Sequence, residues 1–411
     1  MATTQESVAG LSSSLDVKKH ISFLLRCLRL LPQPYTSADD QRMTLGMFAI
    51  SGLDLLNATH KIPPEEKTDL IEWVYEQQSP EGGFRGSPAT PSSSSSSSTA
   101  RGGGNLAMTY AALLILAVLE DDFSRLDRKA LSHFIGSLQD EQEGGFAAQL
   151  PQPHEQKELV DRDPRFTYCA IAICSMLGEW DGIDVEKAKG YLEGCQRYDG
   201  GFGASEAHES HSGMTYCCVA GLHLLPPASQ PKWDRRQEAL SWLAHRQVAP
   251  SVSQSRDPAQ EETKRNTETN DNGSEDSDED EEPELTGGFQ GRPSKLPPDV
   301  CYSFWNGAAL ALLWQHGVID SQADAGYVLS AQSRVGGIAK IPGDHPDLLH
   351  TYLGLASLAL HQPGSAETEE GRQEQEEEEE GEGIEFGMKR LDAAWNCSLD
   401  AKAWIKAKLS K

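Results

Sequence analysis

The sequence predicts an all-α protein in which six helical hairpins close into an α/α barrel, an α6–α6 toroid. The first observation is a repeat: a Gly-Gly-apolar triplet occurs five times, and a glutamine lies four or five residues before four of these triplets. The second is the order around each triplet, with an amphipathic helical pattern before it and a uniformly apolar one after it. The triplets begin at Gly82, Gly144, Gly200, Gly287 and Gly336.

Each unit is expected to pair an outer, amphipathic helix with an inner helix that is buried on all sides. The chain opens with a unit that lacks the glycine pair, in which an amphipathic stretch from Val17 to Leu31 precedes an inner helix from Met43 to Leu56. Glycine suits the turn between the two helices because it accepts positive φ. A last helix, over about residues 387–409, is expected to pack across the barrel. The other inner helices are predicted over 105–119, 166–178, 214–225, 301–314 and 350–360.

Three low-complexity insertions interrupt the repeat, at about residues 87–104, 251–285 and 362–385. In the fourth unit Gln247 lies 40 residues before its triplet, and the interval from Gly200 to Gly287 is 87 residues long. Removing an insertion of roughly 36 residues restores a period of about 51. Because lengthening a connection destabilises a fold only slightly, we expect a single barrel domain over residues 1–411.

The net charge of −27 belongs mostly to two of these insertions. Residues 256–284 and 361–385 each carry −10, which leaves −7 for the rest of the chain, and such like-charge blocks are expected to stay solvated and disordered. No basic stripe predicts nucleic-acid binding. The longest apolar run, Ala111 to Leu119, is too short to span a bilayer, so no integral membrane protein is expected. Eight irregularly spaced cysteines and the absence of a secretion signal predict a reduced, cytoplasmic protein.

Two segments at the starts of inner helices, 286–305 and 345–352, carry candidate metal ligands. Asp299, Cys301 and His350 offer a carboxylate, a thiolate and an imidazole. Three protein ligands with an open fourth position are typical of catalytic zinc. An Asp-x-Cys pair alone is a weak signal, since a cysteine at a helix start is more often a small buried residue. The repeat brings His350 to the same rim one unit later, which favours the metal site.

Five cationic or hydroxyl side chains lie near the same ends of the inner helices: His211, Arg292, Lys295, Tyr302 and Lys340. Any one of them could be an ordinary surface group, but their convergence favours a site that grips a diphosphate. The fold alone does not decide, because such barrels also serve terpene cyclases and glycosidases. The chain has no DDxxD motif, and no DxDD motif outside the acidic tract, which argues against a terpene cyclase.

The segments 286–305 and 345–352 resemble the β subunits of zinc-dependent protein prenyltransferases. The resemblance covers most of the chain apart from the insertions. It implies that Asp299, Cys301 and His350 hold one Zn²⁺. It implies diphosphate binding by the residues that match that site, although the Leu-Pro-Pro between Lys295 and Asp299 is one residue longer than in the family. The implied diphosphate set is His211, Gly213, Arg292, Lys295, Tyr302 and Lys340. The implied isoprenoid-lining set is Thr44, Tyr168, Cys217 and Trp305, with Arg165 on the peptide and product path.

Within this family the chain looks most like the type I geranylgeranyl enzymes. Farnesyltransferases carry a tryptophan where Thr44 stands, and a small residue there leaves room for a fourth isoprene unit. They also carry a magnesium-binding aspartate where Lys340 stands, so the resemblance implies that Mg²⁺ is not required. The segments Leu-Arg-Leu-Leu-Pro and Ser51-Gly-Leu-Asp-Leu-Leu resemble the N-terminal region of the type I enzymes as well.

The resemblance implies transfer of a geranylgeranyl group from geranylgeranyl diphosphate to proteins that end in Cys-a-a-X, with X mainly leucine, such as Rho-type small GTPases. The chain would be the catalytic β subunit of a heterodimer, and the α subunit would lend a lysine to the diphosphate site. Two alternatives remain open. A farnesyltransferase β subunit would prefer the C15 donor and respond to magnesium, and a non-catalytic barrel that binds prenylated tails would have no need for an open zinc site.

Overall fold

The computed structural model describes most of the chain, and the structural statements below concern the described residues. These are residues 14–88, 103–150, 162–205, 207–229, 233–249, 287–293, 296–363 and 384–409. The greater part of each predicted insertion, at 89–102, 250–286 and 364–383, lies outside them, and so does Lys295.

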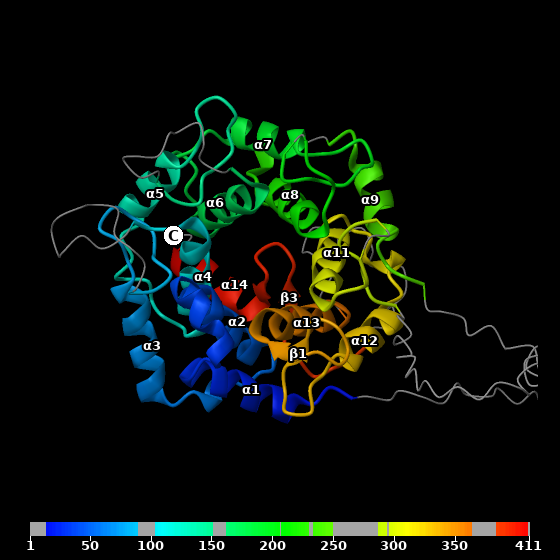
Figure 1. The fold of residues 1–411 in the computed structure, drawn as a ribbon. Helices are drawn as coiled ribbons and strands as arrows, with labels where there is room; N and C mark the ends of the chain where they lie inside the picture. The colour runs from blue at the N-terminus through cyan, green and yellow to red at the C-terminus, as the bar shows by residue number, and fades with distance from the viewer. Residues whose placement is uncertain are drawn as a thin grey trace, which may run out of the picture.

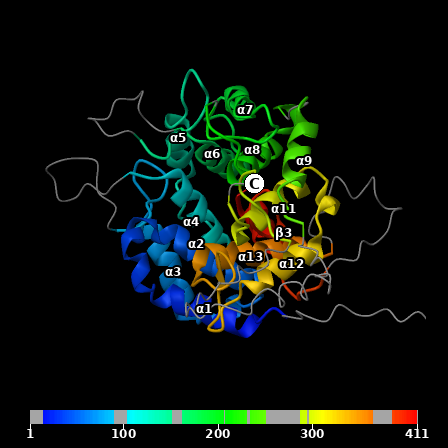
Figure 2. The same cartoon turned by 45° about the vertical axis from the view of Figure 1, so that its right-hand side comes forward.

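Two concentric rings of helices form a barrel, as Figures 1 and 2 show. The inner helices contact one another in chain order, and α13 contacts α2, which closes the ring. The predicted α/α barrel is confirmed, and each inner helix begins and ends within two residues of its predicted bounds. The inner ring consists of α2 (Arg42–Leu55), α4 (Leu106–Val118), α6 (Pro164–Leu177), α8 (Ser212–Leu224), α11 (Val300–Leu312) and α13 (Leu348–Leu360).

The outer helices are amphipathic and cover the inner ring. On α1, for example, His20, Phe23, Leu24 and Cys27 are buried while the opposite side faces solvent. None of the helices in the described residues is long and apolar enough to cross a membrane. The outer ring consists of α1 (Val17–Arg29), α3 (Pro64–Glu76), α5 (Arg128–Ser137), α7 (Val185–Gly194), α9 (Arg236–Ala244) and α12 (Ser321–Ser330). Short 3₁₀ segments join some of the helices, at η1 (Gln33–Gln41), η2 (Thr59–Lys61), η4 (Pro227–Ser229) and η5 (His316–Val318).

The first glycine of each pair lets neighbouring hairpins touch. Its φ is positive in all five turns, between 81° at Gly144 and 99° at Gly82. A Cβ atom at this position would lie 2.1–2.5 Å from a backbone carbonyl oxygen of the next outer helix, as at Gly82 against Ala130. Any other residue would therefore push the units apart. At Gly336 the same approach is made to Lys19 of α1, so the last turn packs against the first helix.

The glutamine before the triplet ties the same two units together. Gln139 Oε1 accepts the amide of Asp184, the N-cap of the next outer helix, at 2.7 Å. Gln332 Oε1 accepts the amide of Asp16 at 2.9 Å, although the two residues are 316 positions apart. The repeated contact therefore also closes the barrel between its last and first units.

A threonine hydroxyl in the inner helix holds each of four turns from the other side. Thr167 Oγ1, for example, accepts the buried amide of Phe146 at 3.2 Å. Water cannot reach these amides, so each hydroxyl satisfies a donor that would otherwise lack a partner. The four threonines are Thr109, Thr167, Thr215 and Thr351.

The C-terminal prediction is wrong in part, because the last helix begins later than expected. Helix α14 spans Leu399–Leu409, and a two-stranded hairpin of β3 (Leu391–Asp392) and β4 (Cys397–Ser398) precedes it. The turn between these strands includes Asn396 at a φ of 46°, a conformation that a helix cannot contain. Figure 1 shows this red segment inside the ring of inner helices.

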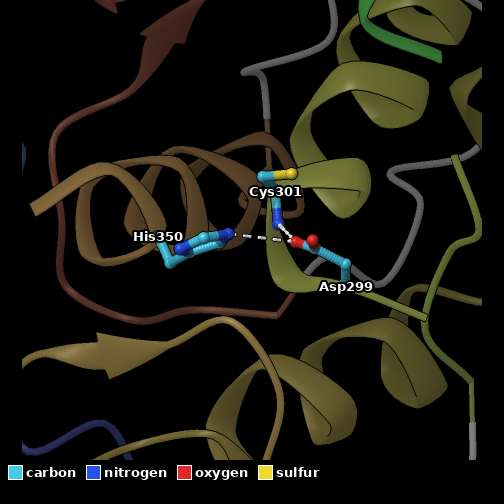
Figure 3. Close-up of side chains that lie close together, drawn as sticks. All are labelled: Asp299, Cys301 and His350. Carbon is cyan, nitrogen blue, oxygen red and sulfur yellow. Dashed lines mark hydrogen bonds and ion pairs between the residues drawn. The ribbon is translucent and has the colours of Figure 1, made fainter. Parts of the chain in front are cut away.

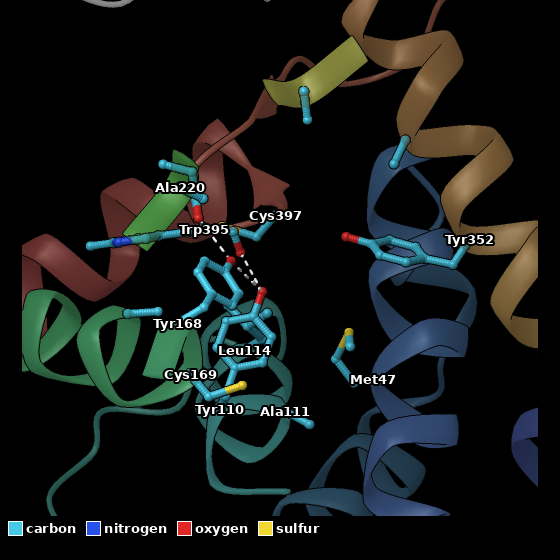
Figure 4. Packing of buried hydrophobic residues seen from close by; sticks show 14 of the residues in the cluster. Met47, Tyr110, Ala111, Leu114, Tyr168, Cys169, Ala220, Tyr352, Trp395 and Cys397 are labelled. Atoms are coloured by element: carbon cyan, nitrogen blue, oxygen red, sulfur yellow. Dashed lines mark hydrogen bonds between the residues drawn. The ribbon is translucent and has the colours of Figure 1, made fainter. Parts of the chain in front are cut away.

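Tyrosines from four inner helices hold the hairpin in the barrel. Each occupies the fifth position after its helix N-cap, and each donates its hydroxyl hydrogen to one of four consecutive backbone carbonyls, as Figure 4 shows in part. Buried carbonyls need such donors, so the hairpin forms a fixed floor. The tyrosines are Tyr216, Tyr168, Tyr110 and Tyr352, and the acceptors are the carbonyls of Ala393, Ala394, Trp395 and Asn396 in that order.

We expect Thr167→Val to destabilise the barrel, because it keeps the side-chain volume but removes the acceptor of the Phe146 amide. The free energy of unfolding should fall by about 1–3 kcal/mol, the effect of leaving a buried donor unpaired. Chemical denaturation measures the change. Thr68→Val is the matched control, since Thr68 is exposed on α3 and its hydroxyl donates to the carbonyl of Pro64. Equal losses from both variants would contradict the role given to the threonines.

Candidate metal centre and donor cluster

The candidate metal ligands lie at the starts of two neighbouring inner helices, α11 and α13. Asp299 is the N-cap of α11, and its Oδ1 accepts the amide of Cys301 at 2.9 Å. Aspartate suits this position because it satisfies a helix amide that has no partner within the helix. His350 lies in the first turn of α13, and the packing of α13 on α11 brings it to the same place. Figure 3 shows the three side chains together.

The geometry of this triad fits a zinc ion. One potential ligand atom from each of Asp299, Cys301 and His350 lies within 4.8 Å of the other two. His350 Nε2 lies 3.2 Å from Asp299 Oδ1. A carboxylate oxygen, a cysteine sulfur and an imidazole nitrogen are a donor set that zinc prefers, and three ligands leave a fourth position for a substrate. The structure therefore brings together the three side chains that the sequence offered as metal ligands.

Asp347 supports the triad and was missed in the sequence. Its Oδ2 lies 2.6 Å from His350 Nδ1, and its Oδ1 accepts the amide of His350 as the N-cap of α13. A carboxylate on one ring nitrogen of a ligand histidine fixes the tautomer and directs the other nitrogen to the metal. The available signal was local, since an aspartate three residues before a ligand histidine at a helix start can serve as both cap and partner.

The electrostatics of the triad are those of a cation site. Burial opposes a charge on His350, but hydrogen bonds with Asp299 and Asp347 outweigh it and raise the pKa of the imidazole to about 9. Burial likewise opposes ionisation of Asp299, yet hydrogen bonds from His350 and Cys301 lower the pKa of its carboxyl group. Burial, and then the neighbouring Asp299, raise the pKa of the Cys301 thiol well above its usual value. A bound metal cation would reverse this last effect and yield a thiolate.

His211 and Tyr302 form a pair of hydrogen-bond donors at the same end of the barrel. His211 is the N-cap of α8, and its Nδ1 accepts the amide of Gly213 at 3.1 Å. The ring proton therefore resides on Nε2, which lies 3.2 Å from Tyr302 Oη. Burial raises the pKa of Tyr302 to about 12, so its hydroxyl keeps its proton at neutral pH. Both groups can donate to an anion.

Of two further predicted cations, Arg292 lies near this donor pair and Lys340 lies near the metal triad. Arg292 Nε lies 3.6 Å from a carboxylate oxygen of Glu209. Lys340 Nζ lies 3.8 Å from Asp299 Oδ2, and more than half of the lysine side chain is exposed. The structure thus places Lys340 beside the metal triad. Lys295 lies outside the described residues.

Arg165 projects from the first turn of α6. Its guanidinium donates to both carboxylate oxygens of Asp163, the N-cap of that helix, at 2.9 and 2.7 Å. Its charge, after burial and Arg292, also helps to lower the pKa of His211, so it lies near the donor pair. Its side chain is 58% exposed, as a residue on a substrate path would be.

The four predicted isoprenoid-lining residues lie on four different inner helices. Thr44 on α2 donates its hydroxyl hydrogen to Met108 Sδ at 3.3 Å, and the Trp305 ring on α11 lies 5.1 Å from the Tyr216 ring. Figure 4 shows Met47 and Tyr352 on one side of the barrel interior and Tyr168 on the other. The hydroxyl of Tyr168 is engaged by the floor hairpin, so only its ring can contact a lipid. The set is Thr44, Tyr168, Cys217 and Trp305.

The comparison with protein families decides the membership of the chain. The profile of the prenyltransferase alpha-alpha toroid domain matches residues 15–395. The chain belongs to this family. A solved member, Candida albicans protein geranylgeranyltransferase-I complexed with GGPP, superposes with a TM-score of 0.73 at 23% identity, covering 96% of this chain and 99% of the other. That likeness supports the toroid fold.

Relatives in this prenyltransferase family agree with the resemblance drawn from the motifs. The geranylgeranyl transferase type-1 β subunit of Arabidopsis thaliana is 34% identical over 85% of this chain and 86% of its own length. The protein of the same name from Dictyostelium discoideum is 32% identical over 85% of this chain and 92% of its own length. A protein farnesyltransferase β subunit of Arabidopsis is more distant, at 28% identity over 72% of this chain. The predicted resemblance to type I β subunits is confirmed.

We expect His211 to stay neutral, with its proton on Nε2, down to about pH 5. Burial, Arg292 and Arg165 lower its pKa from 6.5 to about 4, so the ring gains a second proton only as the pH falls through that value. Nitrogen-15 NMR of histidine-labelled protein reports both the midpoint and the tautomer. The signal is assigned by its loss in His211→Gln. A midpoint near 6.5, or a proton on Nδ1 at neutral pH, would be incompatible with the described hydrogen bonds.

Proposed function

We propose that the chain is the catalytic β subunit of a zinc-dependent protein geranylgeranyltransferase type I. It transfers a geranylgeranyl group from geranylgeranyl diphosphate to the cysteine thiol of proteins ending in Cys-a-a-X, with X mainly leucine. The observation that carries the proposal is that a zinc-type triad and a cluster of anion donors meet at one end of the barrel. That combination suits a reaction in which a thiolate displaces a diphosphate.

Zinc is the cofactor proposed for the triad, one ion per β subunit, held by Asp299, Cys301 and His350. When bound, it lowers the pKa of the acceptor cysteine, which can then react as a thiolate near neutral pH. Asp347 keeps His350 Nε2 directed to the metal position through its bond to Nδ1.

The donor cluster stabilises the leaving group. A bond forms between the acceptor sulfur and C1 of the isoprenoid, the bond from C1 to the diphosphate oxygen breaks, and the thiol proton passes to solvent. Negative charge grows on the diphosphate as that bond breaks, and His211 Nε2 and Tyr302 Oη donate hydrogen bonds to its oxygens. Arg292 and Lys295 add positive charge there.

Lys340 supplies a further positive charge and makes Mg²⁺ unnecessary. Its ammonium group lies next to Asp299 but remains largely exposed, so it can turn toward a bound diphosphate. Magnesium acts in such reactions by neutralising charge on phosphate oxygens, and a fixed ammonium group can take that role. The site therefore needs no second metal.

The proposed partners follow from the reaction. An α subunit completes a heterodimer, a proposal supported by the β-subunit names of the relatives. Rho-type small GTPases are the proposed acceptor proteins, with Arg165 on the path of the peptide and product. Because such acceptors are made in the cytoplasm, a cytoplasmic location is proposed for the enzyme as well.

The proposed lining of the lipid pocket consists of Thr44, Tyr168, Cys217 and Trp305.

The decisive test is a transfer assay on the heterodimer with a Cys-a-a-Leu peptide. Geranylgeranyl and farnesyl diphosphate are compared, each with and without Mg²⁺. We expect the C20 donor to be preferred and the rate to be indifferent to Mg²⁺, since Lys340 supplies the charge. A C15 preference with Mg²⁺ dependence would indicate a farnesyltransferase, and a zinc-loaded heterodimer without transfer would indicate a non-catalytic barrel.

Thr44→Trp should shift donor preference from the C20 toward the C15 chain by about tenfold or more. The indole would occupy the space next to Met108 that we assign to the end of the longer lipid. The ratio of kcat/KM for the two donors measures the shift. Thr44→Val keeps the volume and is expected to leave the ratio unchanged. If both variants behave alike, Thr44 does not border the lipid.

A further inference from the structure

A backbone hydrogen bond links the start of one inner helix to the turn of the next unit. The amide of Leu106 on α4 donates to the carbonyl of Ala148 at 2.8 Å. The amide of Val300 on α11 donates to the carbonyl of Lys340 at 3.0 Å. In each case the acceptor lies four residues after the first glycine of the following unit. The same relation holds for Met43 with Gly86 on α2 and for Ser212 with Gly291 on α8, while α6 begins with Pro164, which has no amide hydrogen.

This backbone hydrogen bond cannot form at α13. The unit that follows α13 around the ring is the first one, which has no glycine turn to supply the carbonyl. There the amide of Leu348 donates instead to a side chain, Tyr35 Oη in η1, at 2.8 Å. Leu348 is fully buried, so its amide has no access to water. At this seam a tyrosine hydroxyl therefore replaces a backbone carbonyl.

The hydrogen bond between Leu348 and Tyr35 lies beside the candidate metal ligands. Leu348 directly follows the strand β2 (Pro346–Asp347), which pairs antiparallel with β1 (Ile338–Ala339), and Ile338 is opposite Asp347. Gly337, directly before β1, donates its amide to His20 Nδ1 at 3.0 Å. The N-terminal segment therefore holds both strands at the same end of this ribbon, which is the end that carries Asp347.

We propose that Tyr35 is a positioning residue for the zinc ligand His350. It acts through the backbone: the hydroxyl fixes the first amide of α13, the fixed helix start places Asp347, and Asp347 bonds both the amide and Nδ1 of His350. This inference rests on the proposed assignment of Asp299, Cys301 and His350 as the zinc site. No other residue within the described ranges is recorded as an acceptor for the Leu348 amide.

The first test is Tyr35→Phe in the full heterodimer, with Tyr75→Phe as the matched control. Tyr75 is also a tyrosine with an engaged hydroxyl, but it lies on outer helix α3 and bonds to Asp121, beyond the far end of α4. The zinc dissociation constant, measured by chelator competition, should rise roughly tenfold in Tyr35→Phe, as for loss of an outer contact to a ligand. It should not change in Tyr75→Phe.

Two further readouts separate positioning from general stability. Hydrogen exchange of the peptide containing Leu348 should accelerate in metal-free Tyr35→Phe. The affinity for geranylgeranyl diphosphate should stay the same, because the donor pair of His211 and Tyr302 lies at the starts of α8 and α11 and not on α13. A Tyr35→Phe protein that melts earlier but binds zinc within twofold of the parent would overturn the proposal.

Leu348→Pro removes the hydrogen bond from the other partner. Proline is favoured at the first position of a helix, α6 already begins with one, and Asp347 has the extended backbone that a following proline needs. If the hydrogen bond carries the effect, Tyr35→Phe will not weaken zinc binding any further in the Leu348→Pro background. Additive losses would refute the inference. Failure of the parent heterodimer to bind zinc would instead refute the proposed function on which it rests.

Discussion

The close approach of a glycine to the next outer helix is the contact on which the barrel depends. With a Cβ only 2.1–2.5 Å from a carbonyl oxygen, no other residue would allow the turn to touch that helix. Once the turn is in contact, the glutamine and threonine hydrogen bonds can form around it. Because the contact repeats from Gly82 to Gly336, successive hairpins rotate into a ring, and the starts of the inner helices gather at one end.

That arrangement makes the helix caps the source of the site. An inner helix that begins at the mouth needs a polar side chain to accept its first amides, so polar groups are present there for a structural reason. Asp299 caps α11 and is also a candidate ligand, and the cap made by His211 leaves Nε2 as the donor. Asp347 caps α13 and orients His350. The caps that the helices require therefore also supply side chains of the candidate site.

The features that could be predicted from the sequence are those that repeat or act locally. The inner helices were predictable because a helix buried on all sides is apolar around its circumference, and the triad because its members occupy related positions in adjacent units. Asp347 had a local signal in its spacing from His350. The contact of Tyr35 with Leu348 joins residues 313 positions apart, and the equivalent contacts described at α2, α4, α8 and α11 use a backbone carbonyl and not a tyrosine hydroxyl. The floor hairpin could not be predicted for another reason. The groups that accept hydrogen bonds from the tyrosines are backbone carbonyls, which every residue has, so they leave no pattern in the sequence.

The contact between the last and the first unit, where the ring closes, constrains how the candidate zinc site can form. A backbone carbonyl can be supplied by any residue, and the acceptors at Ala148, Gly291 and Lys340 are indeed chemically unrelated. At the seam the acceptor is a side chain, so only a residue with a suitable length and hydroxyl position can fill the role. His350 stands on the helix that depends on this one side chain. The candidate zinc site is therefore complete only when α1 and η1 have docked against the last unit, which couples closure of the barrel to assembly of the metal centre.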